Sequence, residues 1–226
     1  MKRVVGSSVI LGVLIWAATA AADSPQLKGD YGFTGTAACL VAPGSSPSAT
    51  NPTPGTPLLN SGFDPITLHP VDGKSFSRSF AVEGIRTFNG NGTGTVKGTE
   101  VGISVPPTPQ SPGYPAFGPS AESGKFSFNF TYTVNGDGSW SSAMVPGSYS
   151  ETFLTGGRAG QTDTVDAIPP VTGLISQDGN TLTSAHLTPT VETHSYSNGD
   201  VWPQICHRSR VYIKLQDRDD DDQDHH

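Results

Sequence analysis

The sequence predicts an all-β protein, built as an antiparallel up-and-down barrel or meander sandwich of about eight to ten strands. Apolar and polar residues alternate with a period of two in several stretches, as expected for strands with one face in the core. Short turn sequences such as Asn-Gly and Asp-Gly separate these stretches. After residue 22, no window shows the i, i+3, i+4, i+7 apolar spacing of an amphipathic helix.

The first half of the chain predicts four long strands. Asn89-Gly90-Asn91-Gly92 is a hairpin turn signal between the second and the third of them. In the third strand, Gly94, Gly98 and Gly102 share one face, which indicates sharp coiling or a close approach of the backbone. The four strands are 31–41, 76–88, 93–105 and 124–135, with Pro-rich loops at 42–62 and 106–122.

The second half predicts shorter strands joined by tight turns. Pro146-Gly147 interrupts or bulges the first of them, 139–155. Asp178-Gly179 and Asn198-Gly199 are the turns of two later hairpins. The remaining strands are 161–168, 171–176, 181–187, 190–196 and 204–215.

The N-terminus has the layout of a secretory signal. Lys2 and Arg3 precede an apolar run that ends at a small-residue cleavage site before Asp23. The alternative is a membrane anchor, but the run is short for a span of about 20 residues. We therefore expect a signal peptide over 1–22, no membrane span after cleavage, and a periplasmic or extracellular protein. One barrel domain over 23–215 and a disordered acidic tail over 216–226 would follow.

The chain has only two cysteines, Cys39 in the first strand and Cys206 in the last. An oxidising compartment would join them in the single disulfide that two cysteines allow. A bridge between the first and last strands fits a sheet that closes on itself, and closure removes exposed strand edges.

The strand faces carry an unusual number of charges. Arg78 and Arg86 alternate onto the face of the phenylalanines in 76–88, and Arg208 and Arg210 share the face of Cys206. Apolar residues of the last strand, Val211 among them, occupy its opposite face. Either a bulge over 207–209 changes the register, or the barrel has a charged interior. Glu192, His194 and Tyr196 share one face of the preceding strand.

Two hypotheses follow for this polar set. With Arg78, Arg86 and Glu83, a charged interior would hold a carboxylate or phosphate, or polarise a carbonyl. The alternative is a structural salt-bridge network at the closing seam, since ion-pair networks produce similar clusters. The aromatic face of 124–135 would line an apolar ligand cavity or simply be core. The ligand-binding candidates are Phe126, Phe128, Phe130, Tyr132, Arg78 and Arg86.

Other chemistries lack a sequence signal. The Gly-x-Ser-x-Gly, His-Glu-x-x-His, P-loop and Gly-x-Gly-x-x-Gly motifs are absent. The histidines have no metal-ligand spacing, although strand geometry would bring His194 near His207, so no metal or cofactor is expected. The net charge of −7 argues against a nucleic-acid partner, which requires clustered Lys and Arg.

Four stretches resemble a family of uncharacterised secreted proteins of Gram-negative bacteria. They are Tyr31-Gly32-Phe33-Thr34-Gly35-Thr36-Ala37-Ala38-Cys39-Leu40-Val41, Val82-Glu83-Gly84-Ile85-Arg86-Thr87-Phe88-Asn89-Gly90, Tyr132-Thr133-Val134-Asn135-Gly136-Asp137-Gly138-Ser139-Trp140 and Ile205-Cys206-His207-Arg208-Ser209-Arg210-Val211. The resemblance implies export and no particular activity. More loosely, the hairpin plan is similar to lipocalin and allene oxide cyclase barrels, which is a fold-level analogy. The Gly-x-Trp start of lipocalins is absent.

We therefore expect an exported, non-catalytic binding or interaction protein, with an unknown small molecule or protein as its partner. A small apolar or amphipathic ligand in a barrel cavity is the more specific form of this hypothesis. The alternative is a cyclase- or isomerase-type enzyme, in which Glu83 or Glu192 is the base and Arg86, Arg208 or Arg210 stabilises negative charge. An outer-membrane barrel is disfavoured because the strands lack continuous lipid-facing apolar bands.

Overall fold

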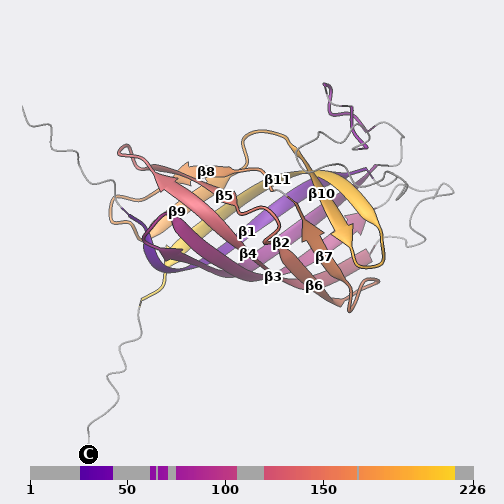
Figure 1. The fold of residues 1–226 in the computed structure, drawn as a ribbon, viewed down its shortest axis with the longest axis horizontal. Coiled ribbons are helices and arrows are strands. Elements are labelled where there is room, and N and C mark those ends of the chain that lie inside the picture. Colours follow the sequence, from indigo (N-terminus) through magenta and orange to yellow (C-terminus); the bar gives the residue numbers. More distant parts are fainter. Residues whose placement is uncertain are drawn as a thin grey trace, which may run out of the picture.

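The structure is a computed structural model that describes residues 26–42, 62–64, 66–70, 75–105, 120–166 and 168–216. These residues form one antiparallel sheet of eleven strands that closes on itself as a barrel (Figure 1). The predicted all-β antiparallel fold is confirmed. The strands are β1 (Lys28–Val41), β2 (Phe76–Asn89), β3 (Thr93–Val105), β4 (Ser120–Val134), β5 (Ser139–Met144), β6 (Ser150–Thr155), β7 (Thr162–Val165), β8 (Val171–Leu174), β9 (Thr181–Ala185), β10 (Val191–Tyr196) and β11 (Val201–Lys214).

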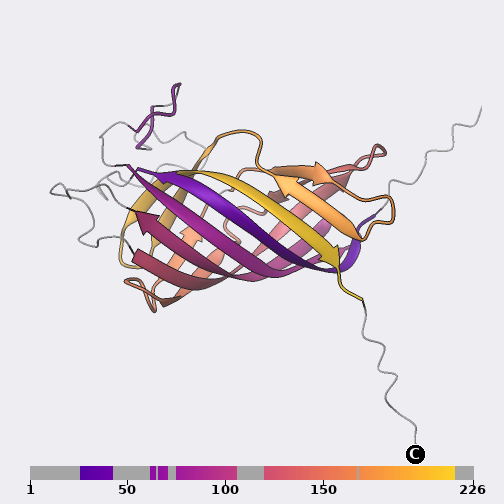
Figure 2. The same cartoon turned by 180° about the vertical axis from the view of Figure 1, so that it is seen from behind.

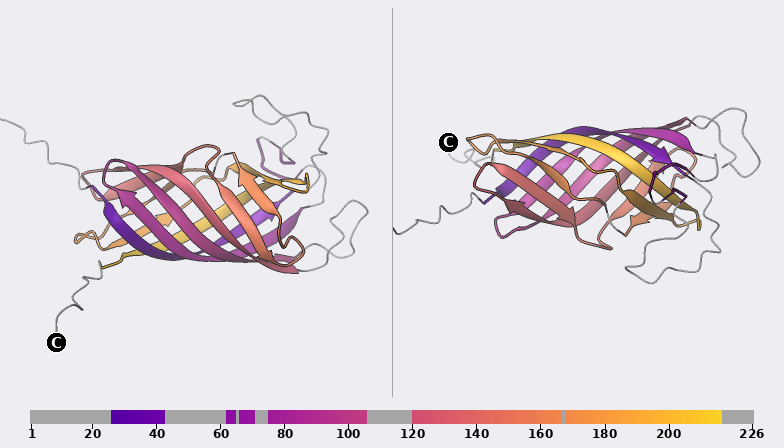
Figure 3. Two further views of the ribbon diagram at one scale, coloured as in Figure 1. Left: turned by 60° about the horizontal axis from the view of Figure 1, so that its bottom comes forward. Right: turned by 90° about the horizontal axis from the view of Figure 1, so that it is seen from above.

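The eleven strands occupy eight positions around the barrel. β1, β2, β3, β4 and β11 are long, and the six short strands form three interrupted ones (Figures 1 and 3). β5 and β6 both pair with β4, and β9 and β10 both pair with β11. Between them, β8 joins β5 to β9, and β7 joins β6 to β10. Each end of the barrel is therefore a closed ring of eight strands in up-and-down order.

Prolines explain the three interruptions. They lie at Pro146, at Pro169 and Pro170, and at Pro189, between the halves of each interrupted strand. Proline has no backbone N–H for the ladder and does not fit a central strand. The predicted interruption at Pro146-Gly147 is thus confirmed. Because the three interrupted strands are neighbours, their breaks lie beside one another in the barrel wall.

The seam between β1 and β11 is regular. The two strands lie side by side (Figure 2) and pair from Tyr31–Lys214 to Val41–Gln204. The disulfide joins Cys39 to the directly opposite Cys206. The register continues through 207–209, so the interior is charged and no bulge changes the face. Arg208 and Arg210 accordingly share the inner face of Cys206, whereas Val211 and Ile213 are exposed on the outside.

The three glycines predicted to share a face of β3 all face inward. A Cβ atom at Gly94 would lie 2.3 Å from the Phe130 ring, and one at Gly98 would lie 2.7 Å from the Phe126 ring. At Gly102 the nearest atom, 2.8 Å away, belongs to the Phe80 ring. The glycines therefore make room for aromatic rings. At Gly94 and Gly98 the nearest atoms are backbone oxygens, of Thr87 at 2.2 Å and of Glu83 at 2.6 Å, which confirms the expected close approach of the backbone at these two positions.

Aromatic residues fill both ends of the barrel. The larger cluster lies at the end closed by β5, β8 and β9 and includes Phe88, Phe130, Trp140 and Tyr212. The smaller cluster lies at the other end, around the disulfide, and includes Phe76, Phe153, Tyr196 and Trp202. Buried charged side chains occupy the space near and between these clusters.

The described residues do not cover every predicted segment. The predicted signal peptide over 1–22 and most of the acidic tail lie outside them, as does most of the two Pro-rich loops. β4 begins at Ser120, so the second loop is shorter than predicted. Within the described ranges, no helix combines the length and apolarity that a membrane crossing requires.

Candidate ligand-binding site

A small cavity of about 70 Å³ lies inside the barrel, next to the three breaks in its wall. Met144, Tyr149, Ile168, Pro169 and His186, from the breaks or their edges, line one side. The rest of the wall comes mainly from long strands and from the short strands of the disulfide end. It includes Ala37, Arg78, Phe80, Val82, Arg86, Glu100, Phe126, Phe128, Ser142, Glu151, Phe153, Asp163, Val171, His194, Tyr196, Gln204, Arg208 and Arg210.

One group of charges near the cavity is internally paired. Glu122 forms ion pairs with Arg78 and with Arg158, the second at 3.4 Å from Oε2 to Nη1. The Arg158 guanidinium also lies 3.7 Å from the centre of the Trp202 ring, a cation–π contact. Burial opposes the charge of Arg78, but Tyr196 and Glu122 outweigh it and raise the pKa of Arg78. This group stabilises the fold at the disulfide end.

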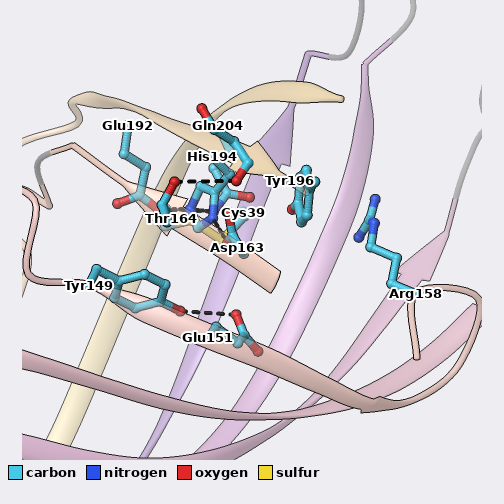
Figure 4. A network of polar contacts seen from close by, with 12 residues as sticks. Cys39, Tyr149, Glu151, Arg158, Asp163, Thr164, Glu192, His194, Tyr196 and Gln204 are labelled. Carbon is cyan, nitrogen blue, oxygen red and sulfur yellow. Dashed lines mark hydrogen bonds and ion pairs between the residues drawn. A yellow bond between two sulfur atoms is a disulfide. The ribbon is translucent and has the colours of Figure 1, made fainter. Parts of the chain in front are cut away.

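A second paired group joins β7, β10 and β11 (Figure 4). Arg208 binds both carboxylate oxygens of Glu192, with Nη1 donating to Oε2 at 2.9 Å. His194 Nδ1 lies 2.5 Å from Asp163 Oδ2, and its Nε2 lies 3.4 Å from Glu192 Oε1. Burial alone would lower the pKa of His194, but Asp163 and Glu192 raise it to about 9. The ring is therefore protonated at neutral pH.

Burial and neighbouring charges also oppose each other at Glu192, but here the net effect is a lowered pKa. Burial would raise its pKa, but Arg208 and His194 lower it well below its usual value. The Gln204 amide donates a further hydrogen bond to Oε1 at 3.0 Å. Glu192 is therefore an ionised carboxylate with its charge fully compensated by neighbouring groups.

Two carboxyl groups of the cavity wall are not compensated in this way. Tyr149 donates its hydroxyl to Glu151 Oε2 at 3.0 Å (Figure 4), and Glu100 is close enough to Glu151 for their charges to interact. Burial, followed by the charges of Glu100 and Asp163, raises the pKa of Glu151 to about 9. Burial likewise raises the pKa of Glu100. The pair therefore holds a proton at neutral pH.

Two guanidinium groups of the wall also lack an acidic partner among the described residues. Arg86 donates to the hydroxyls of Ser142 and Tyr212 only, and its guanidinium lies 3.7 Å from the centre of the Phe130 ring. Arg210 makes a cation–π contact with Phe33 at 5.6 Å. Burial, and then the nearby charge of Arg210, lowers the pKa of Arg86 to about 10.

Several polar atoms of the wall have no hydrogen-bond partner among the described residues. Besides Arg86 and Arg210, whose Nε atoms are unpaired, they include Oε1 of Glu151 and Nε2 of His186. Burial, together with the charge of Arg208, lowers the pKa of His186 to about 4, so that this ring is neutral at pH 7. Buried polar groups are normally paired. The complete set in the wall is Arg78, Arg86, Glu151, Asp163, His186, Gln204 and Arg210.

The structure separates the ligand-binding residues predicted from the sequence into two sets. Phe126, Phe128, Arg78 and Arg86 line the cavity. Phe130 and Tyr132 do not line the cavity, although all four aromatic residues belong to the larger aromatic cluster.

The structure brings together only part of the predicted catalytic set. Glu83 is exposed on the outer face of β2, while Arg86 is buried on the inner face, because an odd and an even position of one strand point to opposite sides. Glu192 is inside but is neutralised by Arg208. His207 is exposed, so the expected approach of His194 and His207 is also wrong.

Sequence reasoning missed three acidic residues and one histidine of the wall: Glu100, Glu151, Asp163 and His186. A signal existed for two of them, because Glu100 shares the glycine face of β3 and Glu151 alternates with Tyr149 and Phe153. In the described part of the chain, no group of three or more His, Cys, Asp or Glu side chains is arranged to hold a metal ion.

Comparisons with known proteins add little. No protein-family model matches this chain, and no curated protein is significantly similar to it. Two solved structures match weakly: the enduracididine biosynthesis enzyme MppR complexed with pyruvate, and the same enzyme with the condensation product of pyruvate and imidazole 4-carboxaldehyde. Each has 11% identity and a TM-score of 0.16; the matches cover 92% and 93% of this chain and 97% of the other. Such low similarity carries no argument, and the resemblance to secreted Gram-negative proteins stays a prediction.

Proposed function

We propose that this protein binds a small oxyanion, a carboxylate or a phosphate, in the barrel cavity. The observation that carries the proposal is a pair of arginines in the cavity wall, the buried Arg86 and the half-buried Arg210, that have no carboxylate partner among the described residues. A guanidinium group without a counter-charge is costly inside a protein, and an oxyanion would compensate it through charge-assisted hydrogen bonds. Ser142 and Tyr212, which already contact Arg86, supply further hydroxyls.

The cavity limits the size of this ligand. One water-sized group needs about 10–15 Å³ of such space. A cavity of about 70 Å³ therefore holds about five to seven non-hydrogen atoms. This size supports a small ligand rather than a lipid or another large amphipathic molecule. The breaks beside Tyr149, Pro169 and His186 are the interruptions of the wall nearest to the cavity, and we propose that the ligand passes there.

The test is calorimetric binding of phosphate, sulfate, acetate and propionate to the full chain, with chloride as the control ion. Arg86→Met should weaken binding by at least about tenfold, because one charge-assisted contact contributes about 1.5–3 kcal/mol. Without ligand the variant should be as stable as wild type or more so, since an uncompensated buried charge is removed. Lys97→Met, on the outer face of β3, is the matched control and should change neither property.

Two results would contradict this proposal. One is the absence of binding by any of these anions to the wild-type chain. The other is an Arg86→Met variant that binds the anions normally but is less stable than wild type, which would make the role of this arginine structural. Arg210→Met provides an independent second variant for the same site. Phosphate and carboxylate titrations together show which oxyanion class the site prefers.

We also propose that the protein is exported. A buried disulfide between Cys39 and Cys206 is compatible with an oxidising compartment. The expected signal peptide predicts that the mature chain begins at Asp23. Intact mass measurement of the protein recovered from the periplasm or medium of a bacterial host checks this, and a chain that keeps residues 1–22 would contradict it.

A further inference from the structure

We infer that the ligand is a small zwitterion, an amino acid whose carboxylate lies at Arg86 and Arg210 and whose ammonium group lies at Glu151 and Glu100. The inference rests on the proposed oxyanion site and adds a second, acidic pole to it. It identifies the ligand class as glycine, β-alanine, γ-aminobutyrate or a molecule of similar size.

Several charged side chains in and near the cavity wall form ion pairs with one another, and others do not. Glu122 pairs with both Arg78 and Arg158, Glu192 pairs with Arg208, and Asp163 pairs with His194. One carboxylate balances only one of the two guanidinium groups at Glu122, and Arg78 also interacts with Glu100. Among the wall groups outside these ion pairs, two arginines and two glutamates can carry a charge near neutral pH, whereas His186 is neutral. The cavity therefore has one basic pole and one acidic pole, and a ligand with both charges would compensate both.

The two poles are separated along β4. Arg86 stacks on the ring of Phe130, while Glu151 lies opposite Phe126, four residues away on the same strand. Four strand residues span about 13 Å between Cα atoms, a distance that the long Arg and Glu side chains shorten from both ends. Phe128 lies between them on the same inner face. One small molecule in the cavity would thus face both groups.

The acidic pole is built to accept an ammonium group. Glu151 is 2% exposed, and its Oε1 has no hydrogen-bond partner among the described residues. Its other oxygen is held by the Tyr149 hydroxyl at 3.0 Å, so the carboxyl group has a fixed orientation. The rings of Phe126, Phe128 and Tyr149 stack at 6.3–6.4 Å next to it and offer faces to a cation.

Proton release gives an observable signature of this arrangement. Without ligand, burial and the acidic neighbours Glu100 and Asp163 hold the pKa of Glu151 at about 9, so the carboxyl group is protonated. An ammonium group beside it favours the carboxylate form. Protonated His194 and the Tyr149 hydroxyl, which also face this pole, do not lose their protons at pH 7 because their pKa values are raised. Binding of an amino acid should therefore release a proton, whereas binding of a plain carboxylate should not.

The experiment compares matched pairs by calorimetry on the full chain: glycine with acetate, β-alanine with propionate, and γ-aminobutyrate with butyrate. Where both members of a pair are small enough for the cavity, the amino acid should bind at least about tenfold more tightly than the plain carboxylate. This is the gain expected for one charge-assisted contact. Titrations in two buffers of different ionisation enthalpy should show proton release for the amino acid only. Glu151→Gln should remove this preference and the proton release while leaving carboxylate affinity unchanged.

The controls separate this inference from the proposed function. Glu83→Gln, the same change on the outer face of β2, should behave like wild type. Equal affinities for amino acids and plain carboxylates, with no proton release, would overturn the zwitterion inference and leave the oxyanion site standing. Retained amino-acid preference in Glu151→Gln would also overturn it. A wild-type chain that binds none of the anions would overturn the proposed function itself.

Discussion

Replacing both Cys39 and Cys206 by alanine is expected to lower the free energy of unfolding by about 5 kcal/mol. The disulfide closes a loop with a sequence separation of 167 residues. In the chain-entropy model, a bridge over a loop of this length stabilises the native state by about 5 kcal/mol, because it restricts the unfolded chain. For a domain of this size, the loss corresponds to a decrease in Tm of about 10–20 °C.

Denaturant unfolding of the double variant, with and without reductant, measures this effect. Reductant should destabilise the wild-type protein to the level of the variant and should not change the variant further. The β1–β11 ladder of eleven residue pairs remains in the variant, so the folded barrel should keep its β-sheet circular dichroism. A loss below about 1 kcal/mol would show that this ladder closes the barrel without help from the disulfide.

The sequence was sufficient to predict the barrel because its local signals agree. Asn-Gly and Asp-Gly turns mark the hairpins, and alternation places Arg78 and Arg86 on the inner face with the phenylalanines. Pro146 marks one break, and Pro169 and Pro189 mark the other two by the same chemistry. These signals depend only on neighbouring residues, so a single sequence contains them.

The direction of each face was harder to predict. A period of two shows that Arg208 and Arg210 share a side, but it does not say which side is the interior. Hydrophobicity alone would bury Val211 and Ile213, yet both are exposed. The ion pair with Glu192 and the disulfide at Cys206 hold the opposite face inside, and both partners come from other strands.

The acidic pole could not be predicted for a related reason. Glu100 comes from β3 and Glu151 from β6, which are far apart in the sequence. β6 reaches β4 only because the break at Pro146 lets the chain continue along the same neighbour. Alternation places each residue on an inner face, but their approach depends on the long-range pairing that closes the barrel.

Raising the pH from 6.5 to 9 is expected to destabilise the protein strongly. Glu151 has a pKa of about 9 in the folded state against an ordinary value of 4.5, and His194 has about 9 against 6.5. Both groups therefore bind a proton more tightly when the chain is folded. Stability that depends on bound protons is lost as the pH rises through the folded-state pKa values, by up to about 1.4 kcal/mol per pH unit for each proton.

Below pH 6.5, the stability should change in a different way. His186 has a pKa of about 4 in the folded state against 6.5, so it opposes folding as the pH falls from 6.5 to 4. Between pH 4.5 and 6.5 this contribution has the opposite sign to that of Glu151, and the two nearly cancel. Glu192, whose pKa is lowered, stabilises the fold above its ordinary value of 4.5 and adds to the loss below it. Stability should thus be nearly constant from about pH 5 to 6.5 and fall on both sides.

Urea unfolding across this pH range measures the slopes. In Glu151→Gln, the residue no longer ionises, so the loss between pH 6.5 and 9 should be about half as steep as in wild type. Glu83→Gln, on the exposed outer face of β2, should keep the full slope. If Glu151→Gln also kept the full slope, the buried carboxyl group would not be the site of the proton, and the acidic pole of the cavity would have to be assigned to other residues.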